Sequence, residues 1–272
     1  MTTLALLAIG LVAGFGGGLL GIGGSLVIIP ALVVLEGPDG QHLYQATAMI
    51  VNFFVVAPAV IRHHLAGATL RAVVRRMIPA AVVGAALGVF LSERAVFRGA
   101  GQGYLQILFA VFLLYVLAYN VSRLRSGTRF DRMLQSDAER LSATRIVAFV
   151  GLPTGVFGGL LGVGGGLIAV PAQQAALRIP LTSAIANSAA TILWSSIVGA
   201  AYKNWELHHH GYSIVQSARL ALCLIPTAMI GSWIAARRVH QWPVAVIRVI
   251  FAALLIYCGV RVFTAGWGQV TG

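Results

Sequence analysis

Long apolar stretches without charge dominate the chain and predict helices that cross a membrane. No Asp, Glu, Lys or Arg occurs in eight windows: 1–35, 40–61, 77–92, 99–122, 146–177, 179–202, 220–236 and 249–260. A helix needs about 20 predominantly apolar residues to cross the hydrocarbon core of a bilayer. The pattern therefore predicts an all-α, polytopic membrane protein with about eight transmembrane helices.

An internal duplication groups these windows into two units. The segment GLVAGFGGGLLGIGGSLVIIPA from Gly10 aligns without gaps on GLPTGVFGGLLGVGGGLIAVPA from Gly151, with 13 of 22 positions identical. The match continues in TAMIVN and TSAIAN, which places Asn52 over Asn187. We expect two four-helix repeats, 1–122 and 146–272, joined by a basic cytoplasmic linker at 123–145. Four crossings per unit would make the repeats parallel, whereas a fifth crossing in each glycine-rich segment would invert the second.

The glycine-rich segments are expected to break the first helix of each unit. As one helix, Thr3 to Leu35 would be longer than the hydrocarbon core, and the glycines with Pro30 provide a break. Irregular backbone at membrane depth survives where it is buried in protein or lines a cavity, so two matched breaks predict a shared central site. A half-helix that starts after Gly24 or Gly165 would direct free N–H groups into this site, which suits an anion.

The predicted substrate-binding residues lie in these breaks or on the uncharged polar positions that follow them. They are Gly23, Gly24, Ser25, Thr47, Asn52, Gly164, Gly165, Gly166, Thr182, Asn187 and Ser188. Two structural roles compete with ligand binding. Small residues at the spacing of Gly10, Gly14 and Gly18 also allow helices to pack closely, and buried polar side chains also join helices by hydrogen bonds.

Composition and charge exclude several other classes of protein. Of the 272 residues, 58% are hydrophobic and 10% are charged, whereas a soluble domain carries about 25% charged residues. The net charge of +12 comes largely from Arg in short connectors, as the positive-inside rule expects, so nucleic acid is not an expected partner. Neither glycine-rich run ends in a Walker A motif, and neither a cofactor nor a metal is expected.

The doubled glycine motif, at 14–31 and 155–172, resembles that of the TauE/SafE family of sulfite and organosulfonate exporters. The family signature falls on Gly21, Gly23, Gly24 and Pro30, and on Gly162, Gly164, Gly165 and Pro171. This resemblance implies a secondary transporter, not an enzyme, that exports sulfite or an organosulfonate such as sulfoacetate by alternating access. Ser25 stands where the second copy has Gly166, so this side of the site is expected to be more polar.

The expected setting is a multi-pass protein of the cytoplasmic (inner) membrane. Its partners would be the lipid bilayer and a small sulfur-containing anion, and a homodimer is left open. No Asp or Glu lies within a predicted span, so no intramembrane proton relay is evident. A negative cell interior would drive export of a monoanion with about 2.3 kcal/mol per 100 mV.

Two other functions stay open from the sequence. A carrier of a metal or another cation could use backbone carbonyls and the histidines 208–210, although adjacent side chains point in different directions. A membrane-embedded enzyme or an assembly subunit is less well supported, because the spans lack clustered acids.

Overall fold

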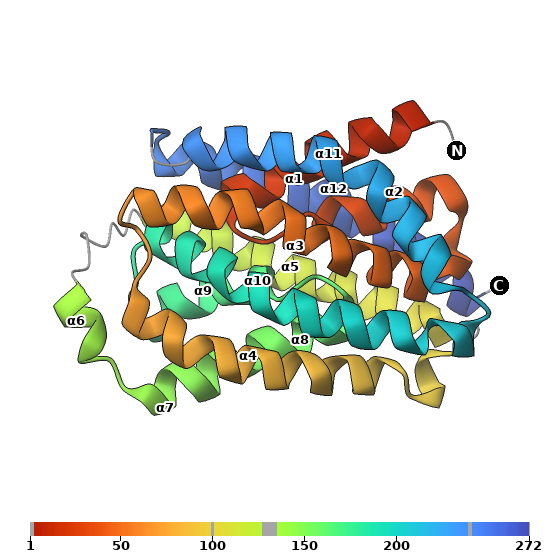
Figure 1. The fold of residues 1–272 in the computed structure, drawn as a ribbon, viewed down its shortest axis with the longest axis horizontal. Coiled ribbons are helices and arrows are strands. Elements are labelled where there is room, and N and C mark those ends of the chain that lie inside the picture. The colour runs from red at the N-terminus through yellow and green to blue at the C-terminus, as the bar shows by residue number, and fades with distance from the viewer. Residues whose placement is uncertain (1–2, 99–100, 127–134, 239–240, 272) are drawn as a thin grey trace.

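The chain folds into a bundle of helices that run along one common direction (Figure 1). The computed structural model describes residues 3–98, 101–126, 135–238 and 241–271, and these ranges contain helices and no strand. The α-helices are α1 (Thr3–Leu20), α2 (Ser25–Glu36), α3 (Gln41–Leu65), α4 (Arg71–Ser92), α5 (Gln102–Ser126), α6 (Gln135–Glu139), α7 (Ala143–Ile146), α8 (Leu152–Leu161), α9 (Gly166–Ala176), α10 (Leu181–Glu206), α11 (Ile214–Arg238) and α12 (Val244–Thr271). Single turns of tighter or wider helix are η1 (Pro38–Gly40), η2 (Ala95–Phe97), η4 (Val147–Gly151) and η5 (Leu207–His210). The expected all-α fold is confirmed.

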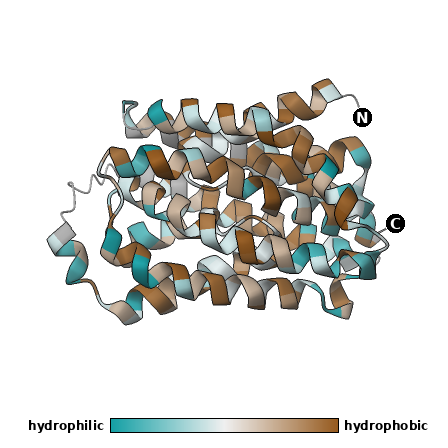
Figure 2. Cartoon of the chain, in the orientation of Figure 1, coloured by the Kyte–Doolittle hydropathy of each residue, from teal (hydrophilic) through white to brown (hydrophobic). Residues whose placement is uncertain are grey.

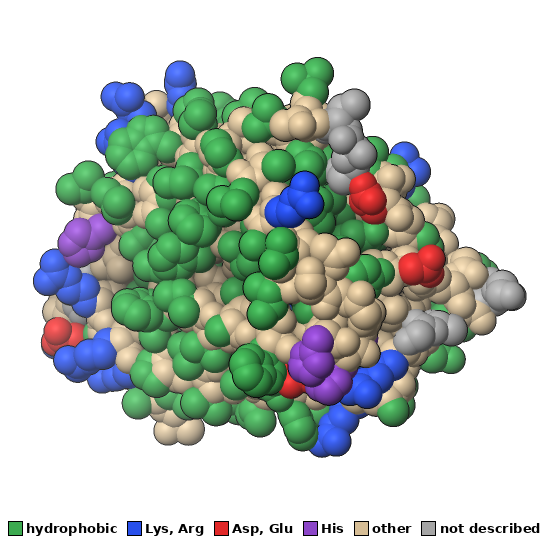
Figure 3. Space-filling model, turned by 45° about the vertical axis from the view of Figure 1, so that its right-hand side comes forward, with side chains coloured by type: hydrophobic (Ala, Val, Ile, Leu, Met, Phe, Trp, Pro, Cys, Tyr) green, Lys and Arg blue, Asp and Glu red, His purple; other side chains and the backbone are tan. Residues whose placement is uncertain are grey.

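The surface of the bundle suits a lipid environment. Seven helical segments in the described ranges are long and apolar enough to cross a membrane. Hydrophobic residues fill the middle of the bundle and polar residues gather toward its ends (Figure 2). Large apolar side chains such as Val111, Trp194 and Leu222 are 52–67% exposed on the flanks, and Figure 3 shows such side chains covering much of one face. The chain is a multi-pass membrane protein.

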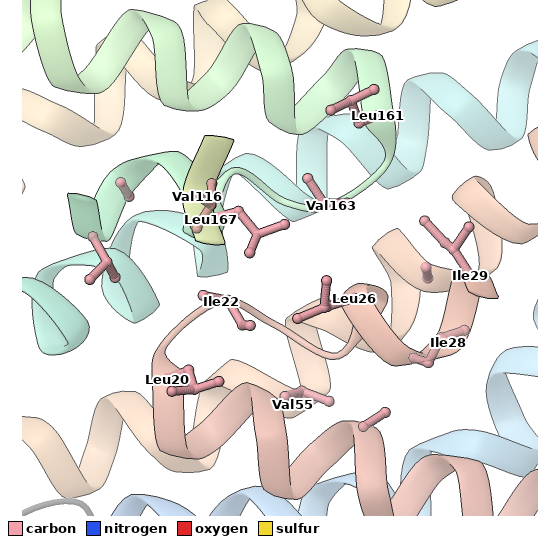
Figure 4. Packing of buried hydrophobic residues seen from close by; sticks show 14 of the residues in the cluster. Leu20, Ile22, Leu26, Ile28, Ile29, Val55, Val116, Leu161, Val163 and Leu167 are labelled. Atoms are coloured by element: carbon pink, nitrogen blue, oxygen red, sulfur yellow. The ribbon is translucent and has the colours of Figure 1, made fainter. Parts of the chain in front are cut away.

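Each glycine-rich segment forms a helical hairpin. In the first, the chain turns back after α1, so that Gly24 lies against Ala13 at the start of α2. In the second, Gly165 lies against Thr154, and α9 returns alongside α8. Figure 4 shows both turns close together in the middle of the bundle, pointing in opposite directions. The expected breaks of the first helix of each unit are therefore present.

The prolines do not make these breaks. The turns occupy 21–24 and 162–165, whereas Pro30 lies inside α2 and Pro171 lies inside α9. A proline removes one hydrogen bond from its helix, but it does not reverse the chain. The expectation that Pro30 contributes to the break is wrong: each turn consists of three glycines and one apolar residue, Ile22 or Val163.

The hairpins also determine how the two units are oriented relative to each other in the membrane. The first hairpin starts and ends at one end of the bundle, and the second starts and ends at the opposite end (Figure 1). Each unit then has three helices that run the length of the bundle, α3 to α5 and α10 to α12. Because three is an odd number of crossings, the second unit runs opposite to the first. Of the parallel and inverted arrangements that the sequence left open, this structure has the inverted one.

Matched glycine contacts join the two units. Gly14 on α1 packs against the backbone of Ala228 on α11, and Gly155 on α8 packs against the backbone of Ala81 on α4. A Cβ atom at either glycine would overlap that backbone, so both positions allow close helix packing. The early glycines thus have the packing role that was weighed for them. The exchange of contacts is compatible with two inverted copies of one unit.

Charged residues are distributed unequally between the two ends of the bundle. The end that contains α6 and α7 carries Arg62, Arg71, Arg75, Arg76, Arg140, Arg145, Arg178, Arg237 and Arg238. The opposite end carries Glu36, Asp39, Glu93 and Glu206 together with Arg94, Arg98 and Lys203. Residues 127–134 of the expected linker lie outside the described residues. The arginine-rich end is called the basic end below, and the other the outer end.

Candidate substrate site at the hairpin tips

Each hairpin turn contains glycines in backbone conformations that other residues rarely adopt. Gly21 and Gly23 have φ angles of 63° and 79° in the first turn. Gly162, Gly164 and Gly165 have φ angles of 75°, 67° and 89° in the second. A side chain at positive φ would strain the backbone, so the repeated glycines are what allows each helix to end and restart at membrane depth.

Asn52 on α3 caps the first hairpin. Its side-chain oxygen accepts a hydrogen bond from the backbone N–H of Gly24 at 2.7 Å and another from Ser25 at 3.1 Å. These N–H groups begin α2 and have no partner within their helix. The sequence predicts a helix start at membrane depth with N–H groups that lack a partner in their own helix. The structure contains it, and the amide oxygen of Asn52 accepts hydrogen bonds from these groups. The N-cap of α9 is Gly165, which has no side chain of its own to cap the helix.

The two tips contact each other directly. A Cβ atom on Gly166 would overlap the Cα of Ile22, so the second hairpin approaches the first through a position without a side chain. Helix α10 holds both turns: the hydroxyl of Ser188 donates to the carbonyl of Gly21 at 2.6 Å, and that of Ser195 donates to the carbonyl of Gly164 at 3.3 Å. The glycine at position 166 is thus explained by this close approach.

Several polar atoms around the tips are buried and make no hydrogen bond within the described residues. They are Nδ2 of Asn52, Oγ of Ser25, Oγ1 of Thr154 and Oε1 of Gln45. Three of the four can donate a hydrogen bond, and each of these three belongs to a residue beside a turn. Buried polar groups are nearly always paired in proteins, so unpaired ones indicate a place for a ligand or for water. Apolar Ile22 and Val163 flank the same tips (Figure 4).

This arrangement can bind a small group rich in oxygen atoms. Hydroxyl and amide donors from both hairpins and from α3 meet in the middle of the bundle, and the start of α2 adds backbone N–H groups and the positive end of a helix dipole. The tips touch, and Ser25 and Asn52 beside them are completely buried, so the site is enclosed in this structure. Opening toward either end requires the tips to separate.

A comparison with protein families identifies the family to which the chain belongs. The family described as the sulfite exporter TauE/SafE matches residues 6–262, nearly the whole chain and both hairpins. The chain belongs to the TauE/SafE family. The description of this family is that of an exporter.

The relatives of this TauE/SafE protein are also described as transporters. A probable membrane transporter protein, YunE of Bacillus subtilis, is 25% identical over 98% of this chain and 99% of its own length. Another, MamO of Paramagnetospirillum magneticum, is 27% identical over 96% of this chain, which spans 44% of MamO. A third, MJ0441 of Methanocaldococcus jannaschii, is 27% identical over 71% of this chain and 69% of its own. No solved structure shows significant similarity.

Not all the residues predicted for the site lie at the tips. The family-motif glycines, Ser25, Asn52 and Ser188 do. Asn187 instead donates to Oε1 of Gln173 at 2.9 Å and accepts from the backbone N–H of Leu70 at 2.8 Å, near the basic end. Thr47 bonds to Ser217 at 3.4 Å, and Thr182 lies half-buried in the first turn of α10.

The contacts also change the pairing of Asn52 with Asn187. Gly23 packs against Asn52, and its counterpart Gly164 packs against Ile192 as well as against Nδ2 of Asn52. The contacts of Gly21 with Ile185 and of Gly162 with Gln45 give the same correspondence between the units. In the arrangement of the two units, Asn52 therefore corresponds to Ile192, five residues beyond Asn187 in the sequence. The short match between TAMIVN and TSAIAN therefore aligns α3 and α10 in a different register from the one that their contacts with the turns indicate. One asparagine, rather than a symmetrical pair, stands at the tips.

A second polar cluster, at the outer end, was not predicted. His42, Glu93, Lys203 and His210 are buried together there, from α3, the segment after α4, α10 and η5. Of the three histidines 208–210, His210 has a side chain that is only 5% exposed. The signal in the sequence was a lysine that interrupts an otherwise apolar stretch near the end of a predicted span.

Proposed function

We propose that this protein exports a small sulfur-containing anion, sulfite or an organosulfonate such as sulfoacetate, across the cytoplasmic membrane by alternating access. The observation that carries the proposal is the contact between Asn52 and the start of α2. There, backbone N–H groups at a helix N-terminus are held by a neutral oxygen in the middle of the bundle. An oxygen of a sulfite or sulfonate group has the chemistry to replace or join the amide oxygen.

The unpaired donors support binding of several oxygens at once. Nδ2 of Asn52 and the hydroxyls of Ser25 and Thr154 are neutral, so they can hold an anion without fixing it by an opposite charge. Transport requires a ligand to leave as well as to bind, and a neutral donor set favours release. The family is described as a sulfite exporter, and sulfite is an anion that such hydrogen-bond donors can bind.

A cavity at the basic end would supply the anion. It measures about 860 Å³ and is lined by His64, Thr69, Arg71, Arg75, Arg76 and Glu139, among others. Clustered positive charge at the mouth of a cleft raises the local concentration of anions. By the positive-inside rule the arginine-rich end faces the cytoplasm, so the anion would load from inside and leave at the outer end.

The structure favours separation of the hairpin tips as the alternating step. Each tip belongs to a hairpin that enters from a different end, and each hairpin packs through glycines on a helix of the other unit. Movement of one hairpin would open the site to one end while the other hairpin keeps it closed. A negative interior would drive a monoanion outward with about 2.3 kcal/mol per 100 mV.

A cation or metal carrier is the competing function, and the polar atoms at the tips argue against it. Of the four unpaired atoms near the tips, Nδ2 of Asn52 can only donate a hydrogen bond, and the start of α2 directs backbone N–H groups and the positive end of its helix dipole into the same place, which disfavours a cation there. Carboxylates within the described residues lie toward the two ends of the bundle.

Reconstitution tests the proposed function. Purified protein in liposomes should move labelled sulfite or sulfoacetate when a potential is clamped across the membrane. Asn52→Leu should abolish this flux, and Thr182→Val, at a polar position away from the tips, should retain it. Flux of a metal cation in place of the sulfur anions would contradict the proposal, as would an Asn52→Leu variant that transports like the wild type.

A further inference from the structure

The buried cluster at the outer end is built around the ammonium group of Lys203. Its Nζ lies 2.6 Å from Oε1 of Glu93, 2.7 Å from Nδ1 of His42 and 2.9 Å from Oγ of Ser92. Lys203 and His42 are completely buried. An ammonium has three protons to donate, and these three acceptors use all of them.

These contacts assign the protons on His42. Because Nδ1 of His42 accepts from Lys203, its proton must sit on Nε2, which donates to the carbonyl of Phe97 at 3.0 Å. His42 is therefore neutral and fully hydrogen-bonded. A second proton on Nδ1 would face the ammonium at the same 2.7 Å, which excludes His42 as a place for an added charge.

His210 is the member of the cluster that can accept a proton. Its Nε2 donates to Oε2 of Glu93 at 2.5 Å, and its ring stacks on that of His42 with 3.7 Å between centroids. Nδ1 of His210 makes no hydrogen bond within the described part of the chain, and its side chain is 5% exposed, in a short turn at the outer surface. A proton from the outer solution can therefore bind the Nδ1 lone pair.

A metal ion fits this place less well. One ligand atom each from His42, Glu93 and His210 lie within 4.8 Å of one another, a spacing that a metal could use. However, the ammonium of Lys203 already contacts two of these three residues. A metal would have to displace a buried cation that makes three hydrogen bonds.

The cluster joins the helices that hold the candidate substrate site. Helix α3 carries His42 and, ten residues later, Asn52, about 15 Å away along the helix. Helix α10 carries Ser195, which tethers a hairpin tip, and Lys203 eight residues later, about 12 Å away. The Lys203 to Glu93 ion pair links α10 to the segment after α4, so it fastens the outer ends of α4 and α10 together.

We propose that this cluster is a proton-binding site that operates the outer gate of the transporter, with Nδ1 of His210 as the atom that takes the proton. With Glu93 ionised and Lys203 charged, the cluster is neutral as long as both histidines are neutral. The added proton makes His210 a cation, which competes with Lys203 for the single carboxylate and repels its ammonium. The ion pair then weakens, and the outer ends of α4 and α10 can separate. This inference rests on the proposed function.

Other charged and titratable groups near the cluster do not replace His210 in this role. Glu206 on α10, Arg94 after α4 and Tyr202 on α10 lie nearby, and none of these three is hydrogen-bonded to the cluster. His209 is 48% exposed and lies 3.6 Å from Glu206, while Nδ1 of His208 contacts the carbonyl of Trp205. His209 is therefore the matched control for His210.

The experiment measures flux of labelled sulfoacetate from proteoliposomes at one fixed potential while the outer pH is varied between about 7.5 and 5.5, the range in which histidine changes charge. The sulfonate is a strong acid, and the carboxyl group of sulfoacetate, like other carboxyls, titrates at about pH 4, so both groups stay ionised throughout and the charge of the substrate does not change. We expect the wild-type flux to rise several-fold as the outer pH falls. His210→Gln keeps a donor at the place of Nε2 but cannot take a proton, and its flux should not depend on pH. Glu93→Gln, which removes the contested charge, should also lose the dependence.

His209→Gln should behave as the wild type. A wild-type flux that is independent of outer pH would overturn the proton site, as would a His210→Gln variant that keeps the dependence. A dependence abolished by a metal chelator would overturn it in favour of a metal ion. Absence of sulfoacetate flux at every pH and potential would instead contradict the proposed function, so the two failures are distinguishable.

Discussion

The side-chain oxygen of Asn52 lies 2.7 Å from the backbone nitrogen of Gly24, twenty-eight residues earlier in the chain. This hydrogen bond joins α3, which runs the length of the bundle, to a hairpin that turns back in its middle. It does for α2 what an N-cap residue does for an ordinary helix, but from a neighbouring helix. The same amide has an unpaired Nδ2 near the second hairpin.

Asn52→Leu should lower stability as well as transport. The substitution leaves the N–H groups of Gly24 and Ser25 without their acceptor, and loss of a helix cap costs about 0.5–2 kcal/mol. The midpoint of thermal unfolding in detergent measures this change. Thr182→Val, in the first turn of α10, is the control and should unfold near the wild-type midpoint. An unchanged midpoint for Asn52→Leu would show that the cap does not stabilise the hairpin.

Gly166→Ala should prevent the hairpin tips from meeting. The added Cβ would overlap the Cα of Ile22, and overpacking of a dense core costs about 1–3 kcal/mol. We expect a lower unfolding midpoint and a strongly reduced flux, because the closed state becomes inaccessible. Gly268→Ala, in α12 with open space around it, should change neither quantity. Wild-type flux in Gly166→Ala would mean that contact between the tips is not part of the transport cycle.

Arg75→Gln should weaken capture of the anion from the basic end. Arg75 is exposed and lines the cavity there, so its charge acts on the approaching anion and not on the closed site. The KM for sulfoacetate from that side should rise several-fold with little change in the maximal rate. The difference should shrink at high salt, which screens exposed charges. Arg98→Gln, at the outer end, serves as the control. If this variant shows an equal rise in KM, the cavity at the basic end is not the entrance for the anion.

Glu93 should make stability depend on pH in a defined direction. Burial alone would raise the pKa of its carboxyl, but the neighbouring His210 and His42 and the charge of Lys203 outweigh burial and hold the pKa well below its usual value. A group with a lowered folded-state pKa stabilises the fold above its unfolded pKa, near 4.5 for Glu, and this contribution is lost as the pH falls further. Unfolding midpoints should therefore fall below about pH 4.5 in the wild type. Glu93→Gln should be less stable at neutral pH and should show a smaller fall. An identical pH profile for both proteins would contradict the assignment.

The sequence predicted the positions of the two breaks because a physical property of glycine marks them. Gly21, Gly23, Gly162, Gly164 and Gly165 all have positive φ, and no other residue type adopts this backbone as readily. The inversion of the second unit was not predicted, because an apolar stretch of about 30 residues has the same composition whether it crosses the membrane or turns back within it. Only the contact of Gly24 with Ala13 distinguishes these paths.

The candidate site was predicted in part for a related reason. Asn52 was found because it is a polar residue in an apolar span that follows the glycine motif, which is a local signal. Asn187 was paired with it through a six-residue match, and contacts across the bundle place Ile192 in the corresponding position instead. The cluster of Lys203 with Glu93 joins residues 110 positions apart. Such a pairing depends on how helices pack, which no local pattern records.

Binding of sulfoacetate to the purified protein, followed by titration calorimetry, tests the central claim that an anion is held at the hairpin tips. Asn52→Asp keeps an acceptor for the N–H groups of Gly24 and Ser25 and should unfold near the wild-type midpoint, but it places a negative charge beside the site. We expect the wild type and Thr182→Val to bind with similar affinity. Asn52→Asp should bind at least about tenfold more weakly, which corresponds to about 1.4 kcal/mol. If Asn52→Asp binds sulfoacetate as tightly as the wild type, the anion does not bind at the tips.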